Sequence, residues 1–381
     1  MTATLSFPLA QPADSQESPA TFGIVVIPDT QIYAQTDSGA EIFVDQFEWI
    51  VENQTNRDFV FVSHVGDVVQ NPQIAAEWDR SEPAFAALDA ADVPYGISPG
   101  NHDMDDGGIA PEYDTRFGTD RYLGEPWFGG NHAAEGNRSS YQTISVDGHD
   151  LLFVHVRHLQ STYGPTQPVL DWVDTVLGDH PDHLAFVTTH EFTFPLGFVL
   201  IPELQQVVQD NCNVVAVFSG HHRGVGRGEF DDSCGRSVHH LVTNYQHFPD
   251  GGQGFLRTVD IDPLTLQADF QVYSPWLDEF RTDPAENFTA ALAPLVPIPG
   301  DVTCDRVLNV SDALVIAQHA VGVRTTHNSC PLPNATTDLN LSAADANNDG
   351  VINVSDALLV AQCVVATPNV LCPELVNEPV G

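Results

Sequence analysis

Polar residues of the types that bind metal ions recur along the N-terminal part of the chain, each just after a short apolar run. In chain order these are Asp29 and Gln31 in IPDTQIY, Asp67 in HVGDVVQN, Asn101, His102 and Asp103 in SPGNHD, His190 in VTTHEF and His221 in FSGHHR. Carboxylate, amide and imidazole groups suit divalent transition metals, and one aspartate can bridge two ions. Two cations can draw charge from phosphoryl oxygens and lower the pKa of a bound water, as phosphoester hydrolysis requires. The set predicts that chemistry, although any one string alone could be an ordinary loop.

The elements that must position these residues follow an α/β pattern, because short apolar runs alternate with helical periodicity from Phe22 onward. Strands are predicted at 22–28, 59–65, 140–146, 151–156, 184–189, 214–219 and 238–243, helices around 42–51 and 75–90, and a closing hairpin at 255–261 with 266–273. The hairpins favour two packed mixed sheets with helices outside, a four-layer α/β/β/α sandwich. In α/β sheets ligands bind beyond the carboxyl ends of strands, so distant residues can converge there.

Composition divides the chain into segments of different character. We predict a flexible leader at 1–21, a catalytic domain at 22–275, a proline-containing linker at 276–300, a small calcium-binding module at 301–373 and a tail at 374–381.

The motifs resemble the calcineurin-like metallophosphoesterase family, in its subgroup whose first motif reads PDTQ. The resemblance covers about residues 22–275, and the GDVVQN and GNHD motifs are its most specific part. It implies a pair of Mn, Fe or Zn ions and a metal-activated hydroxide that attacks without a covalent intermediate. By position it implies that Asp29 and Gln31 face the first metal, that Asp67 bridges, and that Asn101, His190 and His221 hold the second. His102 is implied to donate to a phosphoryl oxygen or to the leaving group, with Asp103 orienting it.

Two positions depart from that family's pattern. The family usually has histidine where Gln31 stands, and its last motif reads GHxH where this chain has GHHR, so Arg223 occupies the place of a first-metal histidine. A guanidinium cannot ligate a cation, so the first metal is expected to be weak, absent, or rescued by His222 or water. Arg223 could instead grip a substrate phosphate. We predict that the second site binds metal more tightly; a catalytically impaired phosphate-binding or scaffold protein is the alternative.

Other histidines give weaker signals. His64, just before the GD motif, is predicted to support the site rather than to ligate. His155 and His158 follow an apolar strand and could line the pocket or simply cap it, while His239 and His240 read as structural or solvated.

The C-terminal part contains a near-duplication, in which NVSDALVIAQ at 309–318 returns as NVSDALLVAQ at 353–362. Each copy ends a calcium-loop pattern: Asp301, Thr303, Asp305, Asn309 and Asp312 in the first, and Asp345, Asn347, Asp349, Asn353 and Asp356 in the second. The first loop has Arg306 where glycine eases the turn, so it should bind calcium more weakly. The following helices are predicted to pack together through Ala313, Leu314 and Ala317, and through Ala357, Leu358 and Ala361.

The duplicated loop and helix resemble a type I dockerin over about residues 300–373. The resemblance implies calcium-dependent folding and a cohesin-like partner; a calcium module without a partner is the alternative. Loops that saturate in calcium-rich extracellular fluid favour a secreted protein.

Charge and cysteine content limit the possible partners and surroundings. Thirteen basic residues, all arginine, face 52 acidic ones, giving a net charge of −39. Such a field repels nucleic-acid polymers and anionic membrane surfaces, and no apolar run is long enough to span a membrane. A small organic phosphoester is the expected substrate. The sequence does not distinguish a phosphomonoester from a phosphodiester. Six cysteines lack CxxC spacing, so disulfides are predicted, with Cys212 and Cys234 as the natural first pair and free thiols as the alternative.

Overall fold

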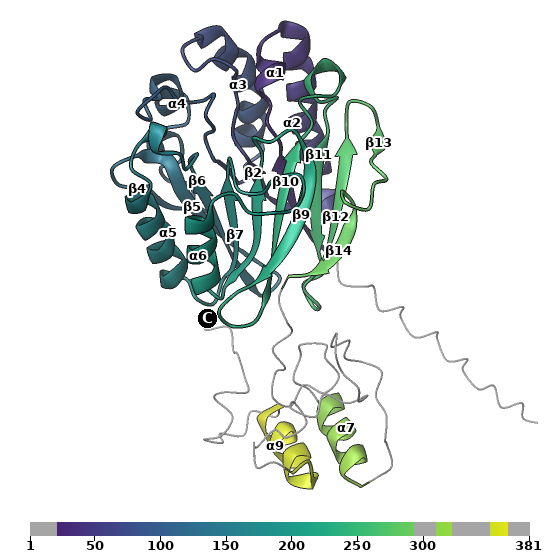
Figure 1. The fold of residues 1–381 in the computed structure, drawn as a ribbon. Helices are drawn as coiled ribbons and strands as arrows, with labels where there is room; N and C mark the ends of the chain where they lie inside the picture. The colour runs from purple at the N-terminus through teal and green to yellow at the C-terminus, as the bar shows by residue number, and fades with distance from the viewer. Residues whose placement is uncertain (1–20, 293–309, 322–350, 365–381) are drawn as a thin grey trace, which may run out of the picture.

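The computed structural model describes residues 21–292, 310–321 and 351–364 (Figure 1). Its larger part contains two seven-stranded sheets. The first has the order β13 (Glu279–Phe280), β12 (Gln267–Ser274), β11 (Leu256–Ile261), β1 (Phe22–Ile27), β2 (Phe59–His64) and β3 (Tyr95–Ile97), with β14 (Phe288–Ala291) also paired to β12. The second has the order β4 (Phe128–His132), β5 (Gly136–Val146), β6 (His149–Val156), β7 (Leu184–Thr189), β8 (Val214–Ser219), β10 (Ser237–Asn244) and β9 (Gly224–Asp231). Both sheets mix parallel and antiparallel pairs.

Helices cover the outer face of each sheet. On the first sheet lie α1 (Gln31–Ala34), α2 (Asp37–Arg57), α3 (Ala75–Ala90) and α4 (Pro111–Arg116), and on the second lie α5 (Gln167–Asp179) and α6 (Pro202–Asp210). Short 3₁₀ turns occur at Thr119–Arg121, Ser161–Tyr163 and Pro249–Gly251.

Alternation along the buried strands explains the layers. All six residues of β1 are buried; Val25 and Ile27 pack with α2 and α3, whereas Ile24 and Val26 face the core between the sheets. Successive side chains of a strand point to opposite faces, so a continuous apolar run fits a strand covered on both sides. Between the sheets, the rings of Phe61 and Phe153 stack at 3.8 Å. The four-layer α/β/β/α sandwich predicted from the sequence is confirmed.

The sheet continues past the predicted end of the catalytic domain. The sequence predicts a linker from residue 276, but β13 and β14 both pair with β12, the latter from Gln267 opposite Ala291 to Phe270 opposite Phe288. These edge strands are two and four residues long. Such short elements carry too little alternation to be recognised beside prolines. The sheet therefore extends to Ala291, beyond the predicted start of the linker.

In the C-terminal part, α7 (Val310–Ala320) contacts α9 (Val354–Val364), as the repeat predicts. Ile316 and Val360, at equivalent positions, are fully buried. The prediction that Leu314 and Leu358 face the partner helix is wrong, because each is 57% exposed. Within the described residues, no helix is long and apolar enough to cross a membrane.

Candidate metal centre

The predicted site residues follow the carboxyl ends of parallel strands in both sheets. Asp29 comes two residues after β1, Asp67 follows β2 and Asn101 follows β3, while His190 and His221 follow β7 and β8. β1, β2 and β3 run parallel, as do β7 and β8. The two sheets therefore contribute to one site at a shared edge.

Four of these side chains, which we call the inner cluster, converge on one point: Asp67, Asn101, His190 and His221. The Nε2 atom of His190 lies 3.1 Å from Oδ1 of Asn101, 3.1 Å from Nδ1 of His221 and 3.2 Å from Oδ2 of Asp67. Ligand atoms about 2.1 Å from a tetrahedral ion lie about 3.4 Å apart, so these spacings fit one cation. His190 donates from Nδ1 to the main-chain oxygen of Val65 at 2.9 Å, which leaves the Nε2 lone pair for a metal.

Two inner-cluster residues adopt a left-handed backbone conformation. Asp67 and His221 have positive φ angles of 52° and 63°. Non-glycine residues in this region cost about 1–3 kcal/mol and cluster at functional sites. Gly220, next to His221, allows a close approach, because a Cβ there would lie 2.3 Å from Oδ2 of Asp29.

Asp29 and Gln31 offer two further oxygen atoms. Oδ1 of Asp29 accepts the main-chain N–H of His221 at 3.0 Å, and Nε2 of Gln31 donates to Oε1 of Gln246 at 3.1 Å. Oδ2 of Asp29 and Oε1 of Gln31 are buried and have no hydrogen-bond partner among the described residues. Unpaired buried oxygens are costly, so they suit a cation. This side of the site lacks an imidazole, because Arg223 is exposed where the family has histidine.

The ionisable groups compensate one another's charge. Burial raises the pKa of Asp29 to about 7, and nearby Asp67 adds to the rise while His190 opposes it. Burial alone would lower the pKa of His190, but the carboxylates of Asp67 and Asp29 outweigh it and raise that pKa to about 10. Without a cation, protonated His190 thus supplies the positive charge that the carboxylates need. A bound metal takes over that charge and requires the neutral imidazole.

Asp103 is placed differently from the prediction that it orients the His102 ring. The main-chain N–H of His102 donates to Oδ1 of Asp67 at 2.9 Å, and its ring Nδ1 lies 2.8 Å from both the main-chain oxygen and the side-chain nitrogen of Gln70. The carboxylate of Asp103 instead accepts the main-chain N–H groups of Gly100 at 2.8 Å and Val69 at 3.1 Å. Asp103 therefore ties two loops together, and Gln70 rather than Asp103 orients the His102 ring.

The remaining histidines near the site differ in whether their ring nitrogens have hydrogen-bond partners. His64 contacts Thr30 at 3.1 Å and accepts the main-chain N–H of Gly66 at 3.0 Å, in the supporting place predicted for it. His155 lies in the core with both ring nitrogens hydrogen-bonded. His158 is buried beside the inner cluster, and both its ring nitrogens lack partners among the described residues.

Sequence reasoning missed Gln70, Gln246, Glu191 and the placement of His158. Gln70 lies inside the recognised GDVVQN motif, and Glu191 directly follows His190, so both could have been considered. Gln246 carries no such signal, because its role depends on where β10 ends.

Two of the ten predicted calcium ligands have described side chains. Asn353 accepts the main-chain N–H of Ser355 at 2.7 Å, and buried Asp356 accepts the main-chain N–H of Asn353 at 2.8 Å. These reciprocal bonds cap the start of α9. The other eight lie outside the described side chains.

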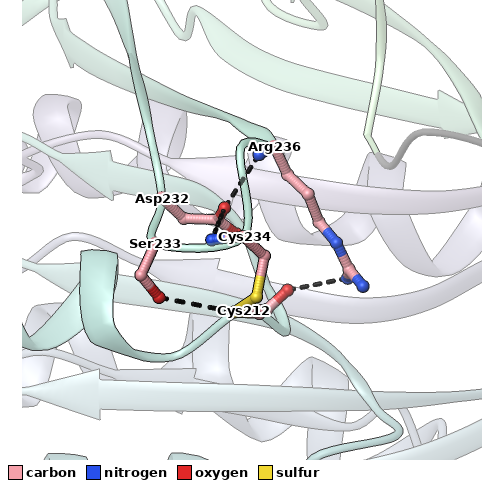
Figure 2. The surroundings of a disulfide bond; sticks show 5 residues. All are labelled: Cys212, Asp232, Ser233, Cys234 and Arg236. Atoms are coloured by element: carbon pink, nitrogen blue, oxygen red, sulfur yellow. Dashed lines mark hydrogen bonds between the residues drawn. A yellow bond between two sulfur atoms is a disulfide. The ribbon is translucent and has the colours of Figure 1, made fainter.

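The predicted disulfide between Cys212 and Cys234 is present (Figure 2). Asp232 accepts the main-chain N–H groups of Cys234 at 2.9 Å and Arg236 at 2.8 Å, and the Arg236 side chain donates to the main-chain oxygen of Cys212 at 2.8 Å. The other four cysteines lie outside the described side chains.

Comparison with known proteins decides the family. Residues 22–222, more than half of the chain, match the calcineurin-like phosphoesterase family. The chain belongs to this family. Residues 299–364 match the dockerin type I domain. Both resemblances seen in the sequence are therefore confirmed.

Individual relatives are more distant. The chain is 32% identical over 271 residues to an uncharacterized protein of Bacillus subtilis (strain 168), YvnB, a match that covers 68% of this chain and 20% of YvnB. The chain thus spans about a fifth of that relative's length. Purple acid phosphatase PPD1 from yellow lupin aligns with a TM-score of 0.47 and 13% identity over 72% of this chain and 54% of that one. GAP50 of Plasmodium aligns with a TM-score of 0.43 and 11% identity over 72% and 89%.

Proposed function

We propose that the protein is a metal-dependent phosphoester hydrolase acting on a small organic phosphate. The observation that carries the proposal is the inner cluster, in which Nε2 of His190 lies 3.1–3.2 Å from a carboxylate oxygen, an amide oxygen and a second imidazole nitrogen. Divalent cations held there supply Lewis-acid polarisation of the phosphoryl group and an acidified water.

Side chains beside the inner cluster are placed to contribute to substrate binding and proton transfer. Gln70 holds the His102 ring by its Nδ1 edge, which leaves Nε2 without a partner among the described residues and available to donate to a phosphoryl oxygen or leaving group. Asp103 connects the GD and GNHD loops, because its carboxylate accepts main-chain N–H groups from both. Arg223 is exposed, and among residues 21–292 it makes no hydrogen bond or ion pair, so its guanidinium is free to bind phosphate.

The C-terminal module suggests where the protein works. The dockerin match supports calcium binding and a cohesin-like partner, and hence action outside the cell. Leu314 and Leu358, exposed at equivalent positions of α7 and α9, offer a twofold-related apolar surface for such a partner. Loss of pull-down by immobilised cohesin on chelation would support the tether, and equal pull-down without calcium would oppose it.

Hydrolysis of p-nitrophenyl phosphate and bis(p-nitrophenyl) phosphate, with and without added manganese, tests the activity. We expect metal-dependent cleavage of one of them, and its identity distinguishes phosphomonoesterase from phosphodiesterase. Phosphate binding without cleavage of either compound would favour the scaffold alternative. A His190→Gln variant is the matched control, because it removes one inner-cluster ligand and should abolish metal-dependent turnover.

A further inference from the structure

The loop between β7 and α6 presents apolar side chains to solvent. Leu196 is 81% exposed, more than any other large apolar side chain in the described part of the chain, and Phe198 is 49% exposed. Phe194 is half-buried, and its ring stacks on that of Phe198 with the centroids 4.9 Å apart. Single exposed apolar residues are common on proteins, but neighbouring ones that form a patch often mark a binding surface. We call residues 194–198 the apolar turn.

The backbone of the apolar turn does not require these side chains. Gly197 donates its main-chain N–H to the oxygen of Phe194 at 2.7 Å, and Phe194 donates to the oxygen of Phe198 at 2.9 Å. Pro195 occupies the second position of this reverse turn and Gly197, with a φ of 81°, the fourth, and both residue types favour such a turn there. Phe194, Leu196 and Phe198 have no such conformational role, and turn positions are commonly polar. Their apolar character therefore needs another explanation.

The apolar turn is fixed on strand β9. A Cβ atom at Gly226 would lie 2.3 Å from the main-chain oxygen of Pro195, and one at Gly228 would lie 2.5 Å from that of Gly197. The two glycines are two positions apart, so they lie on the same face of β9 and let the backbone of the turn rest directly on it. Because the backbone is held at both points, binding of a ligand requires little ordering of the loop.

A series of ring contacts connects the apolar turn to the inner cluster. The centroid of the His221 ring lies 4.7 Å from that of His222, and the His222 centroid lies 5.2 Å from that of Phe194. The side chains of His221 and His222 are each 26% exposed, so neither ring is closed off from solvent. A phosphoester whose phosphate is bound at the metal centre can therefore extend its organic part past His222 to the apolar turn.

The side chains of this loop offer no hydrogen bonds to a ligand. Residues 194–201 read FPLGFVLI, without a polar side chain. A sugar or nucleoside bound there would lose the hydrogen bonds of its hydroxyl groups to water without replacement, which is unfavourable. An aryl or alkyl group would instead be stabilised by the removal of its surface from water. The loop therefore favours apolar organic groups.

We propose that the apolar turn binds the organic group of the substrate and that this group is apolar, such as an aryl ester. The inference rests on the proposed function, because it places the phosphate at the metal centre, and it narrows the substrate class. Phe194 and Phe198 supply rings for aromatic contacts, and Leu196 adds aliphatic surface. A small ligand suits this surface better than a protein partner, since a stable protein interface buries about 800 Å² and roughly 20–30 residues on each side.

Hydrolysis of phenyl phosphate and 2-naphthyl phosphate tests the inference, because the two esters differ by one fused ring. If the enzyme proves to be a phosphodiesterase, the corresponding aryl methyl phosphates replace them. We expect kcat/KM of the parent protein to be about tenfold higher for the naphthyl ester, since the added ring is buried against the apolar turn. Leu196→Ser and Phe198→Ser should each lower this ratio about threefold or more. The leaving groups are the same in every variant, so a change in the ratio reports contacts with the protein.

Leu123→Ser is the matched control. Leu123 is also exposed, at 65%, but it follows the 3₁₀ turn Thr119–Arg121 rather than a strand of the site, so its replacement should keep the parent ratio. Because Leu196 is 81% exposed, Leu196→Ser should fold as the parent does. A ratio near one in the parent protein, or the parent ratio in both Leu196→Ser and Phe198→Ser, would overturn the inference while leaving the hydrolase function intact.

Calorimetry with phenylphosphonate and 2-naphthylphosphonate, which are not hydrolysed, gives a readout that does not depend on activity. We expect the naphthyl compound to bind the parent protein more tightly, and Leu196→Ser to remove most of that difference. If neither ester is hydrolysed, the proposed function fails, and these affinities alone decide the inference. Equal affinities of the parent protein for the two phosphonates would overturn it.

Discussion

Oδ2 of Asp67 lies 3.2 Å from Nε2 of His190, although the two residues extend from different sheets. Asp67 follows β2 of the first sheet and His190 follows β7 of the second. The contact therefore depends on how the two sheets pack, and a cation bound between these atoms would link the layers of the sandwich.

Asp67→Asn should remove zinc from the inner cluster and slow turnover on the order of a hundredfold or more, because it deletes the only carboxylate in that cluster. The fold should survive, since asparagine tolerates the left-handed backbone that Asp67 adopts. Zinc content and chromogenic kinetics measure both effects. Asp92→Asn is the control, because exposed Asp92 has a nearly identical φ of 53°. Unchanged turnover in Asp67→Asn would count against the inner cluster.

His102→Ala should distinguish two roles for the imidazole. If His102 protonates the leaving group, an alkyl phosphate should be hydrolysed about a hundredfold more slowly, whereas p-nitrophenyl phosphate, whose leaving group needs no proton, should be affected less. If it binds a phosphoryl oxygen, both substrates should slow equally. Parallel kcat measurements decide between them, and full activity on both would remove His102 from the mechanism. Gln70→Ala should reproduce part of the effect, because it removes the side-chain contact to Nδ1 of His102 and leaves the main-chain one.

Arg223→Ala should raise KM about tenfold or more with little change in kcat, because a charge-assisted pair to phosphate contributes about 1.5–3 kcal/mol. Arg227→Ala provides the comparison, because the guanidinium of Arg227 packs on the Phe288 ring, 3.9 Å from its centroid. Steady-state kinetics at two salt concentrations measure the difference. Equal KM values for the two variants would exclude Arg223 from substrate binding.

The types of the inner-cluster residues and their position after strands could be predicted from the sequence, because each motif follows an apolar run. The role of Asp103 could not, since it depends on the main-chain groups of Gly100 and Val69 that folding brings to it. The placement of Glu191 and His158 beside His221 could not be predicted for a related reason. Their relation to His221 exists only after β6, β7 and β8 align side by side.

His155 should make the protein sensitive to acid. Burial lowers its pKa from 6.5 to about 3, so the folded state keeps it neutral while the unfolded chain takes up a proton. Its contribution to stability is complete above pH 6.5 and is lost as the pH falls towards 3, at about 1.4 kcal/mol per pH unit. His155→Gln should reduce the slope of the unfolding free energy against pH by that amount, as measured by urea titration. His247→Gln is the control, and an unaltered slope in His155→Gln would refute the assignment.

The two calcium loops should differ in affinity. The second has Gly350 at the sixth position of the loop pattern, where glycine is expected, and its Asp356 caps α9 through Asn353, whereas the first has Arg306 at that position. Asp349→Ala should therefore weaken the tighter of two calcium-binding steps, and the equivalent Asp305→Ala the weaker one, by calorimetry on the full chain. Arg306→Gly should strengthen the weaker step, because the calcium-loop pattern calls for glycine at this position. Identical steps in the parent protein, or no change in Arg306→Gly, would show that the turn residue does not set the affinity.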